Sequence, residues 1–121
     1  MSGAHQRRHA RKPVSHALMI SNGMTGETLG RVGNLSADGM MLITSRPMHE
    51  GWYYQVGFSL QVGAVPPRRL DVGIQCLWTE AARTAGTYWT GCKIIDIAPE
   101  EQQILLRWIE QQGEAEAAHG A

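Results

Sequence analysis

The stretch "WYYQVGFSLQV" at residues 52–62 has the clearest strand pattern in the sequence. Apolar side chains occupy every second position, and the positions between them carry mainly Gln, Ser and Gly. This period of two is typical of a β-strand with one face on a core and the other in solvent. The predicted core face consists of Trp52, Tyr54, Val56, Phe58, Leu60 and Val62.

Segments with the same extended character lie on both sides of this strand. Turn-rich stretches separate them, and the Asn-Gly pair at 22–23 is a strong reversal signal. We expect further strands at 14–21, 28–34, 40–45, 70–79 and 87–96.

The last periodic segment, residues 99–112, is predicted to be a helix. Pro99 and the two glutamates after it suit a helix start, and Gly113 suits its end. Its apolar residues fall on one stripe, which should pack on the sheet. These residues are Ile104, Leu105, Trp108 and Ile109.

Six closely spaced strands followed by one helix predict an all-β fold, a six-stranded antiparallel β-barrel with one C-terminal α-helix. The length of 121 residues suits a single domain. We divide it into a flexible basic arm at 1–13, the barrel with its helix at 14–112, and a frayed tail at 113–121.

The net charge of zero conceals a charge gradient along the chain. Residues 1–26 contain four cations and no acid. A balanced whole argues against non-specific binding along a nucleic acid, whereas a local cationic cluster favours a small anionic ligand. No apolar run is long enough to insert into a membrane, and no secretory signal pattern is present, so we expect a cytoplasmic protein.

The remaining reactive side chains give no pattern of an enzyme or of a cofactor or metal site. Cys76 and Cys92 lie among apolar strand residues and are expected to be buried, reduced thiols. The five histidines are scattered, and no catalytic motif occurs.

Pairing of the first two strands brings two polar segments together. In an antiparallel hairpin the residue numbers of opposite residues have a constant sum. If Ser21 lies opposite Thr28, that sum is about 49, so Val14 lies opposite residue 35 or so. The basic arm then meets the turn "NLSADG" at 34–39. Arginine side chains bind phosphates and stack on aromatic rings, and the amide and hydroxyl of this turn can hydrogen-bond a nucleotide. Glycine at position 39 would permit positive φ and close backbone approach.

These two segments resemble the two motifs of PilZ domains. "RRHAR" fits the Arg-x-x-x-Arg element, and "NLSADG" fits the Asp/Asn-x-Ser-x-x-Gly element, with asparagine in place of the common aspartate. The resemblance covers about residues 7 to 112. It implies a barrel that binds cyclic di-GMP, often as two intercalated molecules. The ligand contacts it implies are Arg7, Arg8, Arg11, Asn34, Ser36 and Gly39.

The resemblance also draws attention to Trp78. Some PilZ domains place a tryptophan near a guanine at the end of the fifth strand, and Trp78 stands at that position. In a regular strand, however, Trp78 would point to the same side as the even-numbered residues Leu70, Val72, Ile74 and Cys76, and this favours a position in the core. Both placements stay open.

The resemblance therefore implies a stand-alone receptor for cyclic di-GMP that signals to an unidentified effector protein through movement of its arm. DNA is not an expected partner. The alternative is a PilZ-fold adaptor that works through protein contacts without a nucleotide. Binding of short single-stranded nucleic acid is a third, weaker reading.

Overall fold

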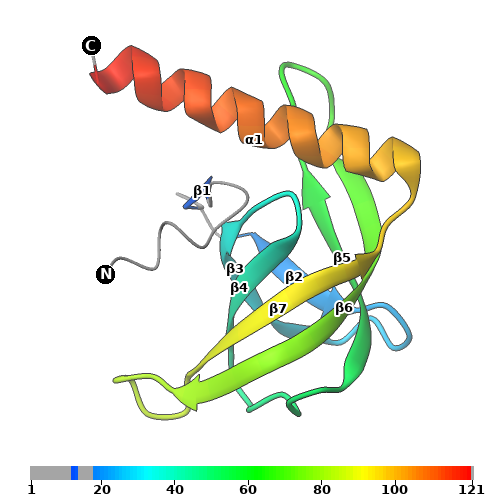
Figure 1. The fold of residues 1–121 in the computed structure, drawn as a ribbon, viewed down its shortest axis with the longest axis vertical. Coiled ribbons are helices and arrows are strands. Elements are labelled where there is room, and N and C mark those ends of the chain that lie inside the picture. The colour runs from blue at the N-terminus through cyan, green and yellow to red at the C-terminus, as the bar shows by residue number, and fades with distance from the viewer. Residues whose placement is uncertain (1–11, 14–17, 121) are drawn as a thin grey trace.

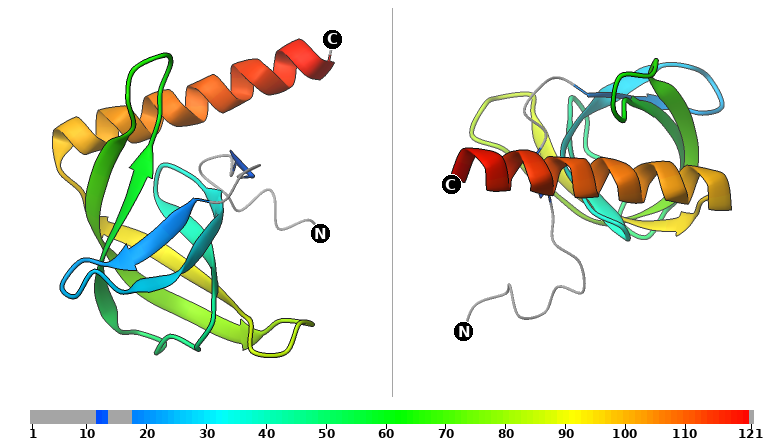
Figure 2. Two further views of the ribbon diagram at one scale, coloured as in Figure 1. Left: turned by 180° about the vertical axis from the view of Figure 1, so that it is seen from behind. Right: turned by 90° about the horizontal axis from the view of Figure 1, so that it is seen from above.

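The computed structural model describes residues 12–13 and 18–120, which form a closed β-barrel crossed at one end by a helix (Figure 1; Figure 2). The short strand β1 and the six longer strands precede the single helix in the chain. Their bounds are β1 Lys12–Pro13, β2 Met19–Asn22, β3 Thr28–Leu35, β4 Gly39–Thr44, β5 Tyr53–Leu60, β6 Arg68–Ala81, β7 Tyr88–Asp96 and α1 Pro99–Gly120.

Six strands form the barrel wall in the order β3-β2-β5-β6-β7-β4, and pairing of β3 with β4 closes it. All of these pairings are antiparallel. The seventh strand, β1, pairs with β3 beyond the part of β3 that β2 covers. The prediction of a six-stranded antiparallel barrel with a C-terminal helix is confirmed.

The hairpin of β2 and β3 begins with the predicted pair, Ser21 opposite Thr28. Its turn is held by Asn22, whose side-chain oxygen accepts hydrogen bonds from the backbone N–H groups of Met24 (2.7 Å) and Thr25 (3.1 Å). Gly26 has a φ of 80°, which favours glycine. The asparagine thus provides the reversal through an Asx-type cap.

The prediction that this hairpin brings the arm to the 34–39 turn is confirmed for residues 12 and 13. Pro13 lies opposite Asn34 and Lys12 opposite Leu35. The predicted sum placed Pro13 opposite residue 36. The observed pairs of β1 with β3 sum to 47, whereas those of β2 with β3 sum to 49 and 50, so the register shift between Ile20 and Ser21 does not account for the difference. Val14 itself lies outside the described residues.

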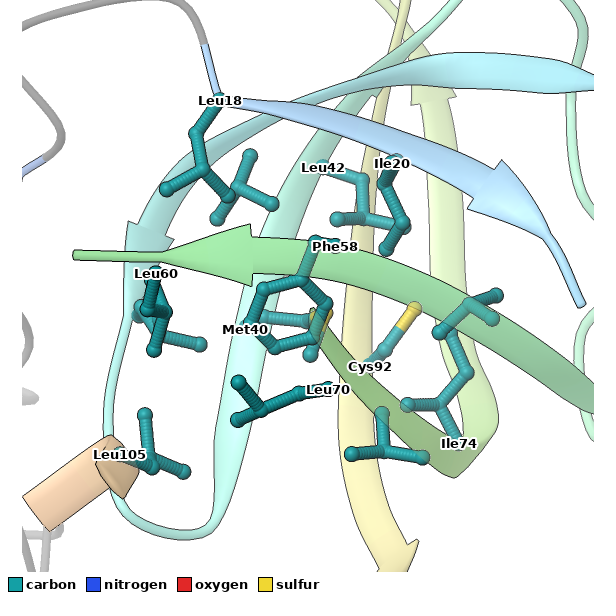
Figure 3. Packing of buried hydrophobic residues seen from close by; sticks show 14 of the residues in the cluster. Leu18, Ile20, Met40, Leu42, Phe58, Leu60, Leu70, Ile74, Cys92 and Leu105 are labelled. Atoms are coloured by element: carbon teal, nitrogen blue, oxygen red, sulfur yellow. The ribbon is translucent and has the colours of Figure 1, made fainter. Parts of the chain in front are cut away.

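The core fills the barrel with side chains from all six wall strands and from α1 (Figure 3). Phe58, Leu60 and Val56 of β5 are buried, as their alternation predicts. Trp52 was predicted to join them but is 58% exposed. It precedes β5, and its ring stacks on His49 with 4.1 Å between ring centroids, so it packs outside the barrel.

Helix α1 packs on the barrel through the predicted stripe. Leu105 and Trp108 are buried, and Ile104 and Ile109 pack against the core at its edge. The helix was predicted to end at Gly113, but it continues to Gly120. A glycine inside a helix costs about 1 kcal/mol, and the alanines and glutamates that follow are strong helix formers. Among the described residues no helix is long and apolar enough to cross a membrane.

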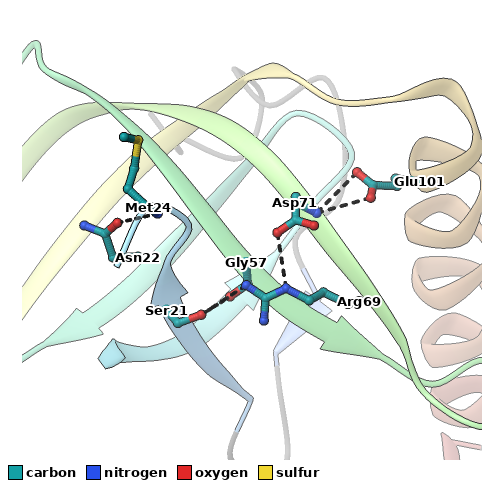
Figure 4. A network of polar contacts seen from close by, with 7 residues as sticks. All are labelled: Ser21, Asn22, Met24, Gly57, Arg69, Asp71 and Glu101. Atoms are coloured by element: carbon teal, nitrogen blue, oxygen red, sulfur yellow. Dashed lines mark hydrogen bonds and ion pairs between the residues drawn. The ribbon is translucent and has the colours of Figure 1, made fainter. Parts of the chain in front are cut away.

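Polar contacts fix the first turn of α1 to the barrel wall (Figure 4). The Glu101 carboxylate accepts a hydrogen bond from the backbone N–H of Asp71 at 3.3 Å. The Asp71 carboxylate in turn pairs with Arg69 at 3.2 Å, and Arg69 reaches Ser21 on β2. Further along the helix, Gln111 accepts a hydrogen bond from the backbone N–H of Gly63 at 2.6 Å. The helix is therefore held at two points of the barrel rim.

Candidate ligand-binding face

The 34–39 turn joins β3 to β4 at the end of the barrel that α1 crosses (Figure 1). Ser36 is 1% exposed, and its backbone N–H donates to the carbonyl of Gly39 at 2.9 Å. Its hydroxyl donates toward the Asp38 carboxylate (2.9 Å) and toward the same carbonyl (3.2 Å). The carbonyl of Asp38 accepts from the N–H of Ile94 on β7. Ser36 therefore holds the turn in shape, and the turn is anchored to the next strand.

The expected role of Gly39 in providing positive φ is wrong. Gly39 opens β4 in ordinary extended pairing with Lys93 and is not among the glycines with positive φ. It is buried at the barrel rim.

Asn34 lies in the middle of a row of residues that crosses the barrel wall. The register places it between Pro13 of β1 and Met41 of β4. Met41 is opposite Gly91 of β7, and Gly91 is opposite Trp78 of β6. The row brings the arm, the 34–39 turn and Trp78 to one side of the barrel, across three strand spacings of about 4.8 Å each between Asn34 and Trp78.

Trp78 points to the outside of the barrel. The register of β6 against β7 shifts between Cys76 and Trp78, so Leu77 is an extra residue in the ladder. This β-bulge reverses the side-chain alternation. Trp78 is consequently 37% exposed, while the hydroxyl of the next residue, Thr79, reaches the buried Thr90 at 3.0 Å. The strand parity that favoured a core position for Trp78 is broken by the bulge.

The Trp78 indole lies across the backbone of Gly91. A Cβ atom at position 91 would collide with Nε1 and Cε2 of the indole. Glycine at this point therefore lets the ring lie flat on β7. The arrangement leaves a partly exposed aromatic surface beside the row that contains Asn34.

Two further residues of this face were not singled out by the sequence. Lys93 is exposed and lies between Gly39 of β4 and Gln75 of β6, so it adds a cation next to the turn. Trp89 is 37% exposed, and its ring lies near Gly33 on β3. Trp89, Gly91 and Lys93 are alternate residues of "TYWTGCKIID", so their side chains point to the same side of β7. The sequence alone did not show that this side faces outward.

A cavity of about 380 Å³ adjoins Trp89 further along the same face. Its walls include Arg31, Ile43 and Arg83. Neither arginine forms an ion pair with another residue of the described part of the chain. The face thus combines aromatic rings, hydrogen-bonding groups and cations, a set that suits a planar anion.

The two cysteines lie on the inner side of the same strands and are free and buried, as predicted. Burial raises the pKa of Cys92 to about 12, with a smaller contribution from Cys76. Burial and the Glu50 carboxylate raise the pKa of Cys76, against a backbone hydrogen bond that lowers it. In the described ranges, no group of three or more His, Cys, Asp or Glu side chains could hold a metal ion.

The predicted arginine contacts, Arg7, Arg8 and Arg11, lie outside the described residues. Arg11 is covalently joined to Lys12, whose pairing with Leu35 is described. The structure therefore brings Asn34, Ser36, Gly39 and Trp78 to one side of the barrel and leads the chain of the arm to the same place.

A family model described as "PilZ domain" matches residues 5–111 of the chain. The match covers most of the 121 residues, and the chain belongs to the PilZ domain family. This family consists of ligand-binding receptor domains. No curated protein matches the chain.

Solved structures of other proteins, one of them a PilZ domain, have the same fold. The PilZ domain of YcgR from Escherichia coli with c-di-GMP has a TM-score of 0.61 and 17% identity, and the match covers 95% of this chain and 98% of that one. The Bacillus subtilis inhibitor of motility MotI/DgrA has a TM-score of 0.72 and 15% identity, with 90% and 52% covered. The K. pneumonia MrkH–c-di-GMP complex has a TM-score of 0.66 and 14% identity, with 95% and 55% covered. The chain thus spans about half the length of MotI and MrkH.

Proposed function

We propose that this protein is a receptor for cyclic di-GMP that passes the signal to a partner protein. Membership of the PilZ family and its similarity in fold to structures solved with c-di-GMP support the proposal. The observation that carries it is the pairing of β1 with β3, which leads the arm to Asn34 and its turn.

The ligand would lie on the outer side of β3, β4, β7 and β6. Arg7, Arg8 and Arg11 would bind its phosphates and stack on its guanines, since guanidinium groups do both. Asn34 would hydrogen-bond the ligand, while Ser36 and Gly39 would shape the turn against which it rests. The Trp78 ring, already flat on Gly91, would stack on a guanine. Lys93 would add a cation beside the turn.

Closure of the arm over the ligand would create the output. Helix α1 contacts β1 as well as β5, so the segment that follows the arginines lies against the helix. A change in the position of the arm would alter the surface formed by the arm, the turn and the helix. The effector protein would recognise that surface.

Calorimetric titration with cyclic di-GMP tests the proposal and gives the affinity and the number of bound molecules together. Arg7→Ala and Arg11→Ala should each weaken binding by ~1–3 kcal/mol, because each removes charge-assisted hydrogen bonds. Arg46→Ala is the matched control. Arg46 is exposed and lines a different cavity, with Glu27 and His49, so its loss should leave the affinity unchanged.

An absence of binding heat at low salt, with the barrel folded, would contradict the proposal. The chain would then be a PilZ-fold adaptor that acts through protein contacts alone. Equal weakening by Arg46→Ala would indicate a general effect of charge and not a specific clamp.

A further inference from the structure

The two cysteines face each other across neighbouring strands. Cys76 of β6 and Cys92 of β7 are direct partners in the register. The backbone N–H of Cys76 donates to Trp52 (2.9 Å) and its carbonyl accepts from Gly51 (2.7 Å), both on the β5 side. On β7 the N–H of Ile94 donates to the carbonyl of Asp38, toward β4, and Cys92, two residues earlier, has the same orientation. The cysteines thus form a non-hydrogen-bonded antiparallel pair.

This geometry suits a disulfide. Partners in a non-hydrogen-bonded pair have Cα atoms about 4.5 Å apart, and disulfides span Cα separations of about 4.4–6.8 Å. Both side chains point into the barrel, with exposures of 0% for Cys76 and 1% for Cys92. The sequence contains only these two cysteines, so within one chain each thiol has a single possible partner.

We propose that Cys76 and Cys92 are an oxidative modification site, at which a hydroperoxide converts two thiols into an intramolecular disulfide. One thiolate attacks the peroxide, forms a sulfenic acid and releases water or an alcohol. The second sulfur then attacks the sulfenic acid, the S–S bond forms and a second water leaves. The two thiols lose two electrons and two protons in total, and the peroxide is reduced.

Burial sets how readily this reaction occurs. The thiolate is the reactive form, and the raised pKa values of both cysteines keep the thiols protonated at neutral pH. The reduced pair therefore resists brief or mild oxidation. A Cα separation of about 4.5 Å, typical of such a pair, lies within the range that disulfides span, and thiol–disulfide exchange can reduce the bond again. The modification is slow to form and reversible.

Oxidation of the cysteines would change the position of Trp78 on the outer face, because the bulge connects Cys76 to Trp78. The Cys76 thiol donates to the carbonyl of Trp78 at 3.7 Å, across the extra residue Leu77. A disulfide removes this proton and turns the sulfur toward β7. The segment that orients Trp78 then loses one of its contacts. Under the proposed function, on which this step rests, the affinity for cyclic di-GMP falls.

The test treats the full-length reduced protein with hydrogen peroxide, traps free thiols with iodoacetamide and maps the peptides by mass spectrometry. The expected product is a monomer in which the peptides containing Cys76 and Cys92 are linked, and dithiothreitol restores both thiols. The NMR indole signal assigned by Trp78→Phe should shift on oxidation and return on reduction. Titration of the oxidised protein should give a Kd raised about fivefold or more.

Cys76→Ala and Cys92→Ala are the matched controls, and in each the Trp78 signal should not respond to peroxide. A protein with two free thiols after prolonged exposure, or one linked only after denaturation, would overturn the modification site. Linked peptides with an unmoved Trp78 signal would overturn its link to the outer face. Because the peptide map and the indole signal need no ligand, they stand even if cyclic di-GMP does not bind.

Discussion

The two halves of β6 differ in how their side chains are oriented. From Arg68 to Cys76 the strand alternates regularly, and Leu70, Val72, Ile74 and Cys76 are all buried. Beyond Cys76 the extra residue Leu77 reverses the alternation, and Trp78 faces outward. One strand thus contributes to the core with its first half and to the candidate ligand-binding face with its second. A single inserted residue is enough to turn a core position into a surface position.

The largest expected effect is a difference in stability between a substitution in the first half of β6 and one in the second half. Ile74→Ala should reduce the free energy of unfolding by about 2–5 kcal/mol, because it leaves a cavity in a closely packed core. Trp78→Ala should cost about 1 kcal/mol or less, because its ring lies on the surface. Urea unfolding followed by circular dichroism measures both. Equal losses would mean that Trp78 is a core residue after all.

The second prediction concerns the glycine beneath Trp78. In Gly91→Ala the new methyl group collides with the indole, so the ring must leave its position on β7. If the ring stacks on a guanine, cyclic di-GMP binding should weaken about tenfold, since base stacking on an aromatic ring contributes about 1–3 kcal/mol. Titration calorimetry measures this change.

Gly33→Ala is the control on the same face. Its methyl group would make ordinary contacts, 3.4 Å from the carbonyl oxygen of Met41 and 3.6 Å from the Trp89 ring. Binding should therefore be nearly unchanged. A tenfold loss in both variants would show that crowding anywhere on the face weakens binding, and the specific role of Trp78 would be lost.

The third prediction uses the buried thiol of Cys92. Its pKa in the folded protein, about 12, lies above its ordinary value of 9.0, so the folded state favours the neutral thiol. This contribution is complete below pH 9. Above that pH the unfolded chain loses its proton first, and the free energy of unfolding falls by up to about 1.4 kcal/mol per pH unit until pH 12.

Unfolding of the reduced protein at pH 8, 9 and 10 checks this slope. The quantity to compare is the difference from Cys92→Ala, because that difference isolates the contribution of this thiol. A slope equal to that of the variant would contradict the effect of burial on the thiol.

The smallest effect is expected for deletion of Leu77. Without this residue, Trp78 follows Cys76 directly, and regular alternation still points it outward and Thr79 inward. The deletion should cost about 1 kcal/mol or less, because Leu77 is 51% exposed. Unfolding experiments and the exposure of Trp78 to a fluorescence quencher test it. Burial of Trp78 in the deletion variant would contradict the side-chain alternation from which its outward orientation is argued.

The strand pattern was enough to predict the barrel. Alternating apolar residues identified β5 and β6, and the stripe on α1 identified the helix face that packs on the barrel. Each of these elements buries one side, and burial of one side requires apolar residues at regular intervals in the sequence. The end of α1 was placed too early, since one glycine does not stop a helix of strong helix formers.

The candidate site was predictable in its parts but not in its layout. The two motifs drew attention to Asn34, Ser36 and Gly39, and the hairpin explained why the arm would meet them. Bulges could not be foreseen, because an extra residue in a ladder has no required composition. Two of them, at Gly33 and at Leu77, determine how Asn34 and Trp78 align across the wall. Lys93 and Trp89 were missed because the sequence did not show which side of β7 faces outward.

The attachment of β1 to β3 sets a limit on what each arginine can reach. Lys12 is fixed opposite Leu35, and an extended chain advances at most about 3.6 Å per residue. The covalent bond to Lys12 limits the backbone of Arg11 to one residue length from that attachment. Arg7, five residues from the attachment, has a tether of about 18 Å, which is longer than the three strand spacings from Asn34 to Trp78. Under the proposed function, the position of each arginine in the arm would decide which phosphate of the ligand it can reach.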